Sequence, residues 1–138
     1  MYIVANSWIV FSLEEKKEHM KRNRIIHWVA TGLLSVIVLA SGVGYLFKTA
    51  EVIEVFATLG FPSFIVIPLG IAKIAGVIVI VTKKWKWLTE WVYAGFNFNF
   101  FLAFCAHMSV GDKEWLGAVV ALVLLYISYS FWKIGWQE

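Results

Sequence analysis

Residues 61–90 have the sequence FPSFIVIPLGIAKIAGVIVIVTKKWKWLTE. From Pro62 to Thr82 this stretch holds about 20 apolar residues, and a helix of that length, rising 1.5 Å per residue, crosses a hydrocarbon core of roughly 30 Å. Three lysines, Lys83, Lys84 and Lys86, follow directly and mark its end. The stretch therefore predicts a membrane-spanning helix.

Lys73 lies inside this predicted span, about ten residues or roughly 15 Å of helix before the basic cluster, so its ammonium is expected near the bilayer midplane. An ionisable group at that depth costs at least ~2.5–3.5 kcal/mol and normally faces protein or water. Two interpretations follow. Lys73 either locks the helices together through Asn97 and backbone carbonyls, or it binds an anionic or quinone-like oxygen. Pro68, about one turn away, predicts a kink that would open room for a ligand.

The composition supports lipid as part of the solvent, because 61% of the 138 residues are hydrophobic and only 15% are charged. The net charge of +3 comes from basic residues clustered between apolar runs, which points to membrane topology, and no nucleic-acid motif is present. The single cysteine, Cys105, can form no internal disulfide and belongs to no metal-binding pattern. We expect it to be a small core residue.

Four apolar runs predict four spans, at about 25–47, 62–82, 87–109 and 115–132. Joined by short loops, they predict an all-α integral membrane four-helix bundle with antiparallel up-down topology. Residues 48–60, between the first two runs, are too short and too charged to cross. They predict a short interfacial helix that ends at Gly60.

Basic residues predict the orientation of this bundle, because they are enriched on the cytoplasmic side of membrane proteins. Only Lys48 and Lys113 lie at the other end, so both termini are expected in the cytoplasm. The residues expected at the cytoplasmic end are Lys16, Lys17, Lys21, Arg22, Arg24, Lys83, Lys84, Lys86 and Lys133, with an aromatic belt of Trp28, Trp85, Trp87, Trp91, Trp132 and Trp136.

Residues 1–24 are predicted to be a cytoplasmic extension of the membrane domain at 25–138. Ser12 to Glu15 form a capping-box pattern, which favours a helix that starts at Ser12 and runs into the first span. An alternative is that the ordered chain begins at Met20, with a poorly ordered segment before it.

The first span carries small and polar residues along one side. His27, Thr31, Ser35 and Gly42 recur at helical spacing, with Ser41 and Tyr45 close by. In lipid such a face favours close helix packing, and we interpret it in this way. A ligand or catalytic role for His27 is the alternative.

The third span is the most polar of the four. Glu90 lies one turn inside its basic end and is expected to pair with Lys86 or with His27, and Asn97 lies two turns further along the same face, at the depth of Lys73. Asn99 points the opposite way, on a ridge of small residues that suits helix contact. His107 is expected near the outer end, and the ridge consists of Gly95, Ala103 and Ala106.

Several motifs in this order resemble the DoxX-like family of small bacterial membrane proteins with four spans. The resemblance covers roughly residues 25–132. It rests on Thr31-Gly32-Leu33-Leu34, Ser41-Gly42, Leu59-Gly60-Phe61-Pro62, Leu69-Gly70-Ile71-Ala72-Lys73, Glu90-Trp91-Val92-Tyr93-Ala94-Gly95-Phe96, Ala106-His107 and Gly111-Asp112.

The resemblance implies that Lys73, Glu90 and His107 occupy characteristic family positions, and that an acidic residue is usual where this chain has Asn99. A neutral amide cannot relay a proton as a carboxylate would. The family takes its name from a membrane subunit linked to quinone-dependent sulfur oxidation, so the resemblance makes a quinone a candidate cofactor.

Three functions remain open. The chain has small-residue ridges and no complete catalytic set, which favours a non-catalytic accessory or assembly subunit that packs with itself or with a larger membrane complex. The second hypothesis is a redox-accessory protein that binds a quinone or another small amphipathic ligand around Lys73. The third, a small-solute transporter, would require an oligomer, because no inverted repeat is detectable.

Overall fold

The computed structural model describes residues 1–137, with side chains described through residue 135. Over this range the chain is all-α. Its elements, in order, are α1 (Tyr2–Phe47), α2 (Thr49–Thr58), the short 3-10 helix η1 (Ser63–Ile65), α3 (Val66–Thr82), α4 (Lys86–Val110) and α5 (Trp115–Gln137). Two positions of the sequence predictions, the Trp136 side chain and Glu138, lie outside the described part.

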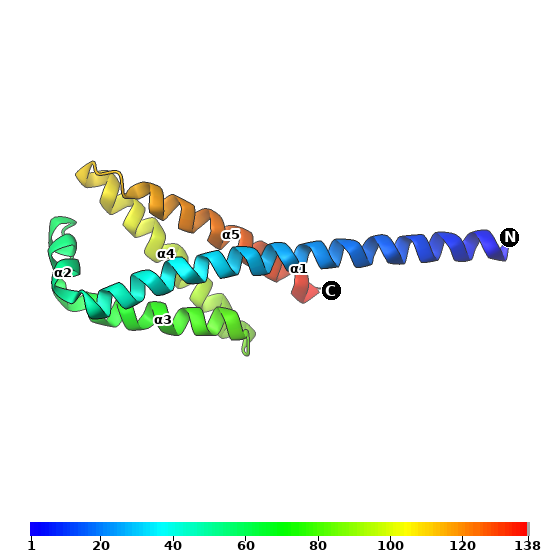
Figure 1. Ribbon diagram of the computed structural model, residues 1–138, viewed down its shortest axis with the longest axis horizontal. Coiled ribbons are helices and arrows are strands. Elements are labelled where there is room, and N and C mark those ends of the chain that lie inside the picture. The colour runs from blue at the N-terminus through cyan, green and yellow to red at the C-terminus, as the bar shows by residue number, and fades with distance from the viewer. Residues whose placement is uncertain (138) are drawn as a thin grey trace.

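Four long helices pack along one another, and we call residues 25–135 the helical body (Figure 1). α1 packs against both α3 and α5, α4 packs mainly against α5 and less against α3, and α2 lies across one end. The core contains Leu34, Val38, Val77, Ile80, Phe96 and Leu125, each no more than 5% exposed. The small and polar stripe of α1 faces inward, as predicted, since His27, Thr31, Ser35 and Gly42 are all buried.

Three helical segments are long and apolar enough to cross a membrane: α1, residues 63–82 and α5. Only 28–33% of each apolar window is buried within the chain, so the greater part of their apolar surface faces outward. α4 matches the third predicted span in position and has 25 residues, but it is not among the three. Its glutamate and asparagines lower its hydropathy, and its crossing of the membrane stays a prediction.

The helix ends follow the sequence signals. α1 ends at Phe47 and α3 at Thr82, as predicted from the charges that follow them. α2 ends in a Schellman motif, in which Gly60 takes a φ of +83° and the Phe61 amide donates to the Phe56 carbonyl at 2.8 Å. The short helix predicted between the first two spans is therefore confirmed as a helix.

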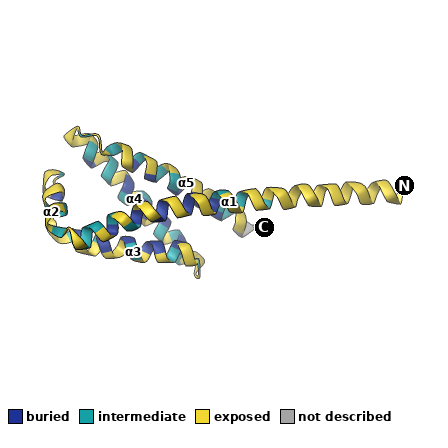
Figure 2. Cartoon of the chain, in the orientation of Figure 1, coloured by how far each residue is buried: buried dark blue, intermediate teal, exposed yellow. Residues whose placement is uncertain are grey.

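The predicted helix start at Ser12 is wrong, because α1 is continuous from Tyr2. Residues 2–11 contain no glycine or proline that would break a helix, and the Ser12 hydroxyl donates back to the Ile9 carbonyl at 2.9 Å instead of capping. The first part of α1 projects beyond the helical body, and almost all of its residues are exposed (Figure 2).

Three other expectations are also corrected. Pro68 is the third residue of α3, in the first turn, where a helix needs no amide donor, so it produces no kink in mid-span. Trp132 is 3% exposed and belongs to the core, because α5 turns its side chain toward the tyrosines of α4 and α5. Cys105, predicted to lie in the core, is exposed on the outer face of α4.

Candidate functional site

Lys73 lies on α3 where this helix meets α1, and it is 6% exposed. Its ammonium donates to the Ser41 hydroxyl at 2.8 Å and lies 4.0 Å from the centre of the Tyr45 ring. Both contacts depend on a close approach of the two helices, because a Cβ atom on Gly42 would lie 3.2 Å from the Gly70 carbonyl oxygen. Two facing glycines therefore bring the polar side chains of α1 within reach of the buried lysine.

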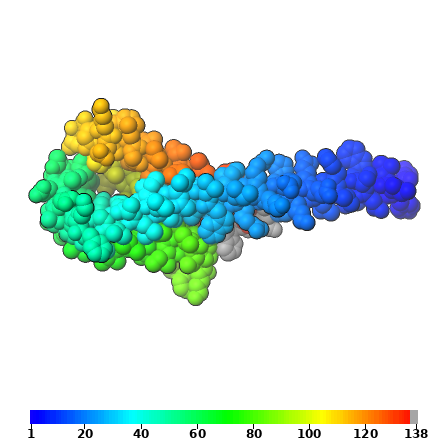
Figure 3. Space-filling view, in the orientation of Figure 1, coloured from blue at the N-terminus to red at the C-terminus, as the bar shows by residue number. Residues whose placement is uncertain are grey.

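Lys73 lines a cavity of about 240 Å³, which we call the Lys73 cavity. Its walls come from α1, α2, α3, α4 and α5, and they extend from Lys73 to Glu114 in the connection between α4 and α5. The space-filling view shows a hollow at this end of the molecule, between α2, α1 and the start of α5 (Figure 3). Most lining side chains are apolar or aromatic, and the polar ones are Ser41, Tyr45, Lys73, Asn99, His107 and Glu114.

α2 covers this end of the cavity. Its Phe56 is 7% exposed and packs edge-on against the Tyr45 ring, with 5.4 Å between ring centres. Phe61 packs against the other side of Phe56 at 5.7 Å. The Schellman motif that ends α2 thus also places an aromatic wall opposite the lysine.

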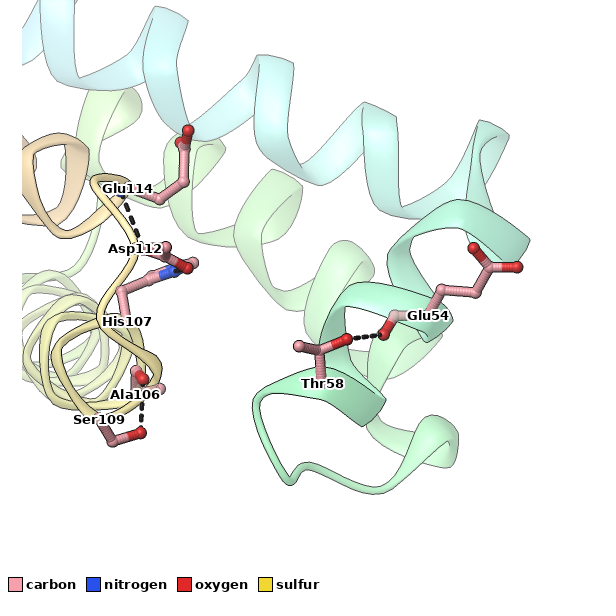
Figure 4. A network of polar contacts seen from close by, with 7 residues as sticks. All are labelled: Glu54, Thr58, Ala106, His107, Ser109, Asp112 and Glu114. Atoms are coloured by element: carbon pink, nitrogen blue, oxygen red, sulfur yellow. Dashed lines mark hydrogen bonds and ion pairs between the residues drawn. The ribbon is translucent and has the colours of Figure 1, made fainter.

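His107 lines the cavity, and it lies with its neighbour Asp112 across from α2 (Figure 4). The His107 Nδ1–H donates to Asp112 Oδ2 at 2.8 Å, and Asp112 Oδ1 accepts the Glu114 amide at 2.9 Å. The hydrogen bond from His107 is the main reason that the pKa of Asp112 lies below its ordinary value. These bonds fix the connection between α4 and α5 and so hold His107 and Glu114 in the cavity wall.

A second polar cluster lies at the opposite, basic end of the helical body. The His27 Nδ1–H donates to the Ser128 carbonyl at 2.9 Å, so His27 Nε2 carries no proton and accepts from the Lys83 ammonium. The Tyr93 and Ser128 hydroxyls lie 2.7 Å apart, and those of Ser128 and Thr31 lie 2.6 Å apart. His27, Thr31 and Ser128 are all buried, so the cluster joins α1, α4 and α5 inside the protein.

Next to this cluster is a pocket of about 360 Å³, which we call the His27 pocket. It opens between α1, the end of α3 and the last turns of α5. Its described lining consists of Met20, Asn23, Arg24, His27, Trp28, Lys83, Phe131, Trp132 and Gly135.

Glu90 and Asn97 lie in neither place. They line a groove between α4 and α5, where Glu90 forms an ion pair with Lys133 and Asn97 accepts a hydrogen bond from the Tyr126 hydroxyl at 2.7 Å. The expected contact of Asn97 with Lys73 is therefore wrong. So is the expected pairing of Glu90 with His27. Both pairings were predicted because the residues lie at similar depths along their helices. Asn97 instead faces α5, and His27 faces Ser128.

The six candidate residues thus separate into three sets. Lys73, Asn99 and His107 share the Lys73 cavity, His27 belongs to the basic end, and Glu90 and Asn97 share the α4–α5 groove. Sequence reasoning missed Ser41 and Tyr45 as the partners of Lys73. The available signal was their spacing of four residues beside Gly42, which puts both on the face of α1 that can approach α3.

The chemistry open to the Lys73 cavity is binding by hydrogen bonds and by a positive charge. No carboxylate of the described residues forms an ion pair with Lys73, and Ser41 uses one of the three donors of its ammonium. Within residues 1–137, no group of three or more His, Cys, Asp or Glu side chains is placed to hold a metal ion.

Comparisons with known proteins identify the family of this chain. Searches of curated proteins and of solved structures each found no significant match. The family model described as the DoxX-like family matches residues 29–130, which is more than half of the chain and includes the Lys73 cavity's lysine, asparagine and histidine. The chain belongs to the DoxX-like family.

Proposed function

We propose that this protein is a multi-pass protein of the bacterial inner membrane that binds a small amphipathic molecule of the quinone type in the Lys73 cavity. One observation carries the proposal: a buried lysine without a carboxylate partner in the described chain lines a cavity. A lysine kept only to join helices has no need of the empty volume beside it.

Four crossings are part of this proposal. With 25 residues, α4 is roughly 37 Å long, which exceeds the hydrocarbon thickness of about 30 Å. Asn99 and His107 line the cavity, Asn97 bonds to Tyr126 of α5, and Glu90 is paired with Lys133. Four crossings put both termini on one side, and the basic residues at that end favour the cytoplasm.

The cavity suits a ring with an oxygen acceptor. Its volume of about 240 Å³ lies just below the ~300–1,000 Å³ of most ligand pockets, which favours a single headgroup with its tail in the surrounding lipid. The free donors of Lys73 can bind a carbonyl or anionic oxygen, and the Tyr45, Phe56 and Phe61 rings supply flat apolar walls. Asn99 and His107 add hydrogen-bonding groups on the opposite wall.

A binding titration tests the proposal. Full-length protein in an uncharged detergent is titrated with a short-chain ubiquinone analogue, and quenching of tryptophan fluorescence is followed. Lys73→Met keeps the length of the side chain but removes the donors, and a charge-assisted hydrogen bond is worth ~1.5–3 kcal/mol, so the dissociation constant should rise about tenfold or more. Lys48→Met, which removes an exposed lysine outside the cavity lining, is the matched control. Equal affinity in wild type and Lys73→Met would refute the site.

A second candidate function is assembly with another copy or with a larger membrane complex. The observation that favours it is the projecting part of α1, where the apolar residues Tyr2, Trp8 and Phe11 are 60–89% exposed. Deletion of residues 2–13 should abolish association in native membranes solubilised in mild detergent, without a change in Tm. A wild-type protein that purifies only as a monomer, with no partner retained, would exclude this function.

A further inference from the structure

The His27 pocket gathers positive charge. Arg24 and Lys83 supply this charge, His27 lines the pocket beside them, and none of the described lining residues is a carboxylate. Glu90, the acidic residue at this end of α4, forms an ion pair with Lys133. We propose that the pocket is a phosphate-binding site, for the headgroup of an anionic phospholipid or for free phosphate.

The backbone at Lys83 supports a built site. Lys83 ends α3 with a φ of +50°, in the left-handed region, and no other non-glycine residue of the described chain has a positive φ. This conformation costs a lysine roughly 1–2 kcal/mol, and glycine or asparagine would normally occupy it. Such an outlier persists only where the surroundings hold it in place, and residues of this kind cluster at functional sites.

Contacts in the pocket show what this conformation achieves. The left-handed backbone at Lys83 directs its side chain to His27, and the Lys83 ammonium lies 4.1 Å from the centre of the Trp28 ring. Lys84, the next residue, instead extends toward Trp85, outside the pocket. The strained residue is therefore the one that brings its charge inward, where burial lowers the pKa of Lys83. A bound anion would offset that effect.

His27 and Arg24 complete the site. The bond from His27 to Ser128 fixes the ring so that Nε2 faces Lys83, and the ring is 4% exposed, so it cannot turn away. Arg24, one turn earlier on α1, lines the same pocket and forms no ion pair within the described chain. A guanidinium fork beside an ammonium is the combination that binds phosphate oxygens, and basic pockets between membrane helices bind lipid headgroups.

The experiment measures stabilisation by each phosphate source in an uncharged detergent. Full-length protein is titrated with phosphatidylglycerol, phosphatidylcholine or sodium phosphate at constant ionic strength, and Tm is recorded, since a ligand stabilises the folded state by RT ln(1 + [L]/Kd). The test variants are Lys83→Gly, which relieves the strained φ, and Arg24→Gln, which removes an exposed charge that forms no ion pair within the described chain. The matched controls are Lys84→Gln and Lys21→Gln, which lie on the same two segments outside the pocket lining.

We expect phosphatidylglycerol to raise the Tm of wild type and both controls, and its dissociation constant to rise about tenfold or more in Lys83→Gly and Arg24→Gln. A response to sodium phosphate with the same dependence on Lys83 and Arg24 would support the site and assign it to free phosphate. The proposal is overturned if phosphatidylcholine, phosphatidylglycerol and phosphate act equally. It is also overturned if the controls lose the response as much as the test variants do. Lys83→Gly is expected to fold because glycine adopts a positive φ without strain, so lost binding in that variant cannot be attributed to unfolding.

Discussion

Replacing Lys73 by methionine should change the free energy of unfolding by no more than about 1–2 kcal/mol. The buried ammonium costs ~2.5–3.5 kcal/mol at this depth. Against this, its hydrogen bond to Ser41 stabilises the folded protein by ~1.5–3 kcal/mol, and its contact with the Tyr45 ring stabilises it by ~0.5–2 kcal/mol. The two sides nearly cancel, so the lysine contributes little net stability. Methionine fills the same space, and the half-buried Ser41 hydroxyl can bond to the carbonyl one turn before it on α1.

A lysine that held the helices through a buried ion pair would behave differently. Its loss would strand a buried carboxylate and cost about 3–5 kcal/mol. The two cases are separated by unfolding in mixed micelles of an uncharged detergent and dodecyl sulfate, followed by circular dichroism. Leu34→Ala sets the scale, because Leu34 is 0% exposed and its truncation should cost ~2–5 kcal/mol. Lys48→Met serves again as the control for loss of a lysine.

The binding role of Lys73 is refuted if Lys73→Met destabilises the protein as much as Leu34→Ala while the affinity for the quinone analogue is unchanged. Lys73 would then be a structural residue. If Lys73 is a binding residue, Lys73→Met should weaken binding and leave stability unchanged, because the buried ammonium contributes to the affinity for a ligand and not to the stability of the fold.

Three further outcomes follow from other parts of the helical body. Gly76→Ala should lower the free energy of unfolding by about 1–3 kcal/mol, because the new Cβ would lie 2.5 Å from a ring atom of the buried Phe96. Gly95→Ala, whose new Cβ would have no atom within 4 Å, should be neutral. Chemical unfolding of both variants measures the difference. Ser128→Ala should cost about 1–3 kcal/mol in the same assay, because two buried hydroxyls lose their shared partner. The lowered pKa of Asp112 means that its carboxylate stabilises the folded state above its unfolded pKa of about 4, and that this contribution disappears as the pH falls through the lower folded value. Tm profiles of wild type and Asp112→Asn should therefore differ at neutral pH and converge in acid. Parallel profiles would show that the bond to His107 does not affect folding.

The sequence predicted the helices well because their limits are local. An apolar run stops where charge, glycine or proline begins, so the predicted ends at residues 47, 82 and 109 agree within one residue with the ends of α1, α3 and α4. The inward face of α1 was also predictable, because small and polar residues recur at helical spacing and lipid does not reward their exposure.

The partners of the polar residues could not be predicted in this way. Helical rise gives the depth of a residue but not the neighbour that it faces, and Asn97 matched the depth of Lys73 while facing α5. The missing information is the register of α1 on α3, which the approach of Gly42 and Gly70 sets. Lys83 was interpreted as one of several topological lysines, because nothing in the sequence shows that its backbone turns left-handed and its side chain inward.

The two polar sites lie on opposite sides of a packed apolar layer. Lys73 and Lys83 are ten residues apart on the same segment, roughly 15 Å along a helix, and between their sites the side chains of Leu34, Val77 and Ile80 are 0–4% exposed. In the described part of the chain, each site therefore opens at its own end, and this layer separates them. A solute that entered one could not reach the other through a single copy without opening the core, which is close-packed. Two separate sites suit a protein that holds one ligand in the Lys73 cavity and a phosphate group at the basic end, and transport would require a path between copies. Flux through liposomes containing monomeric protein would contradict this conclusion directly.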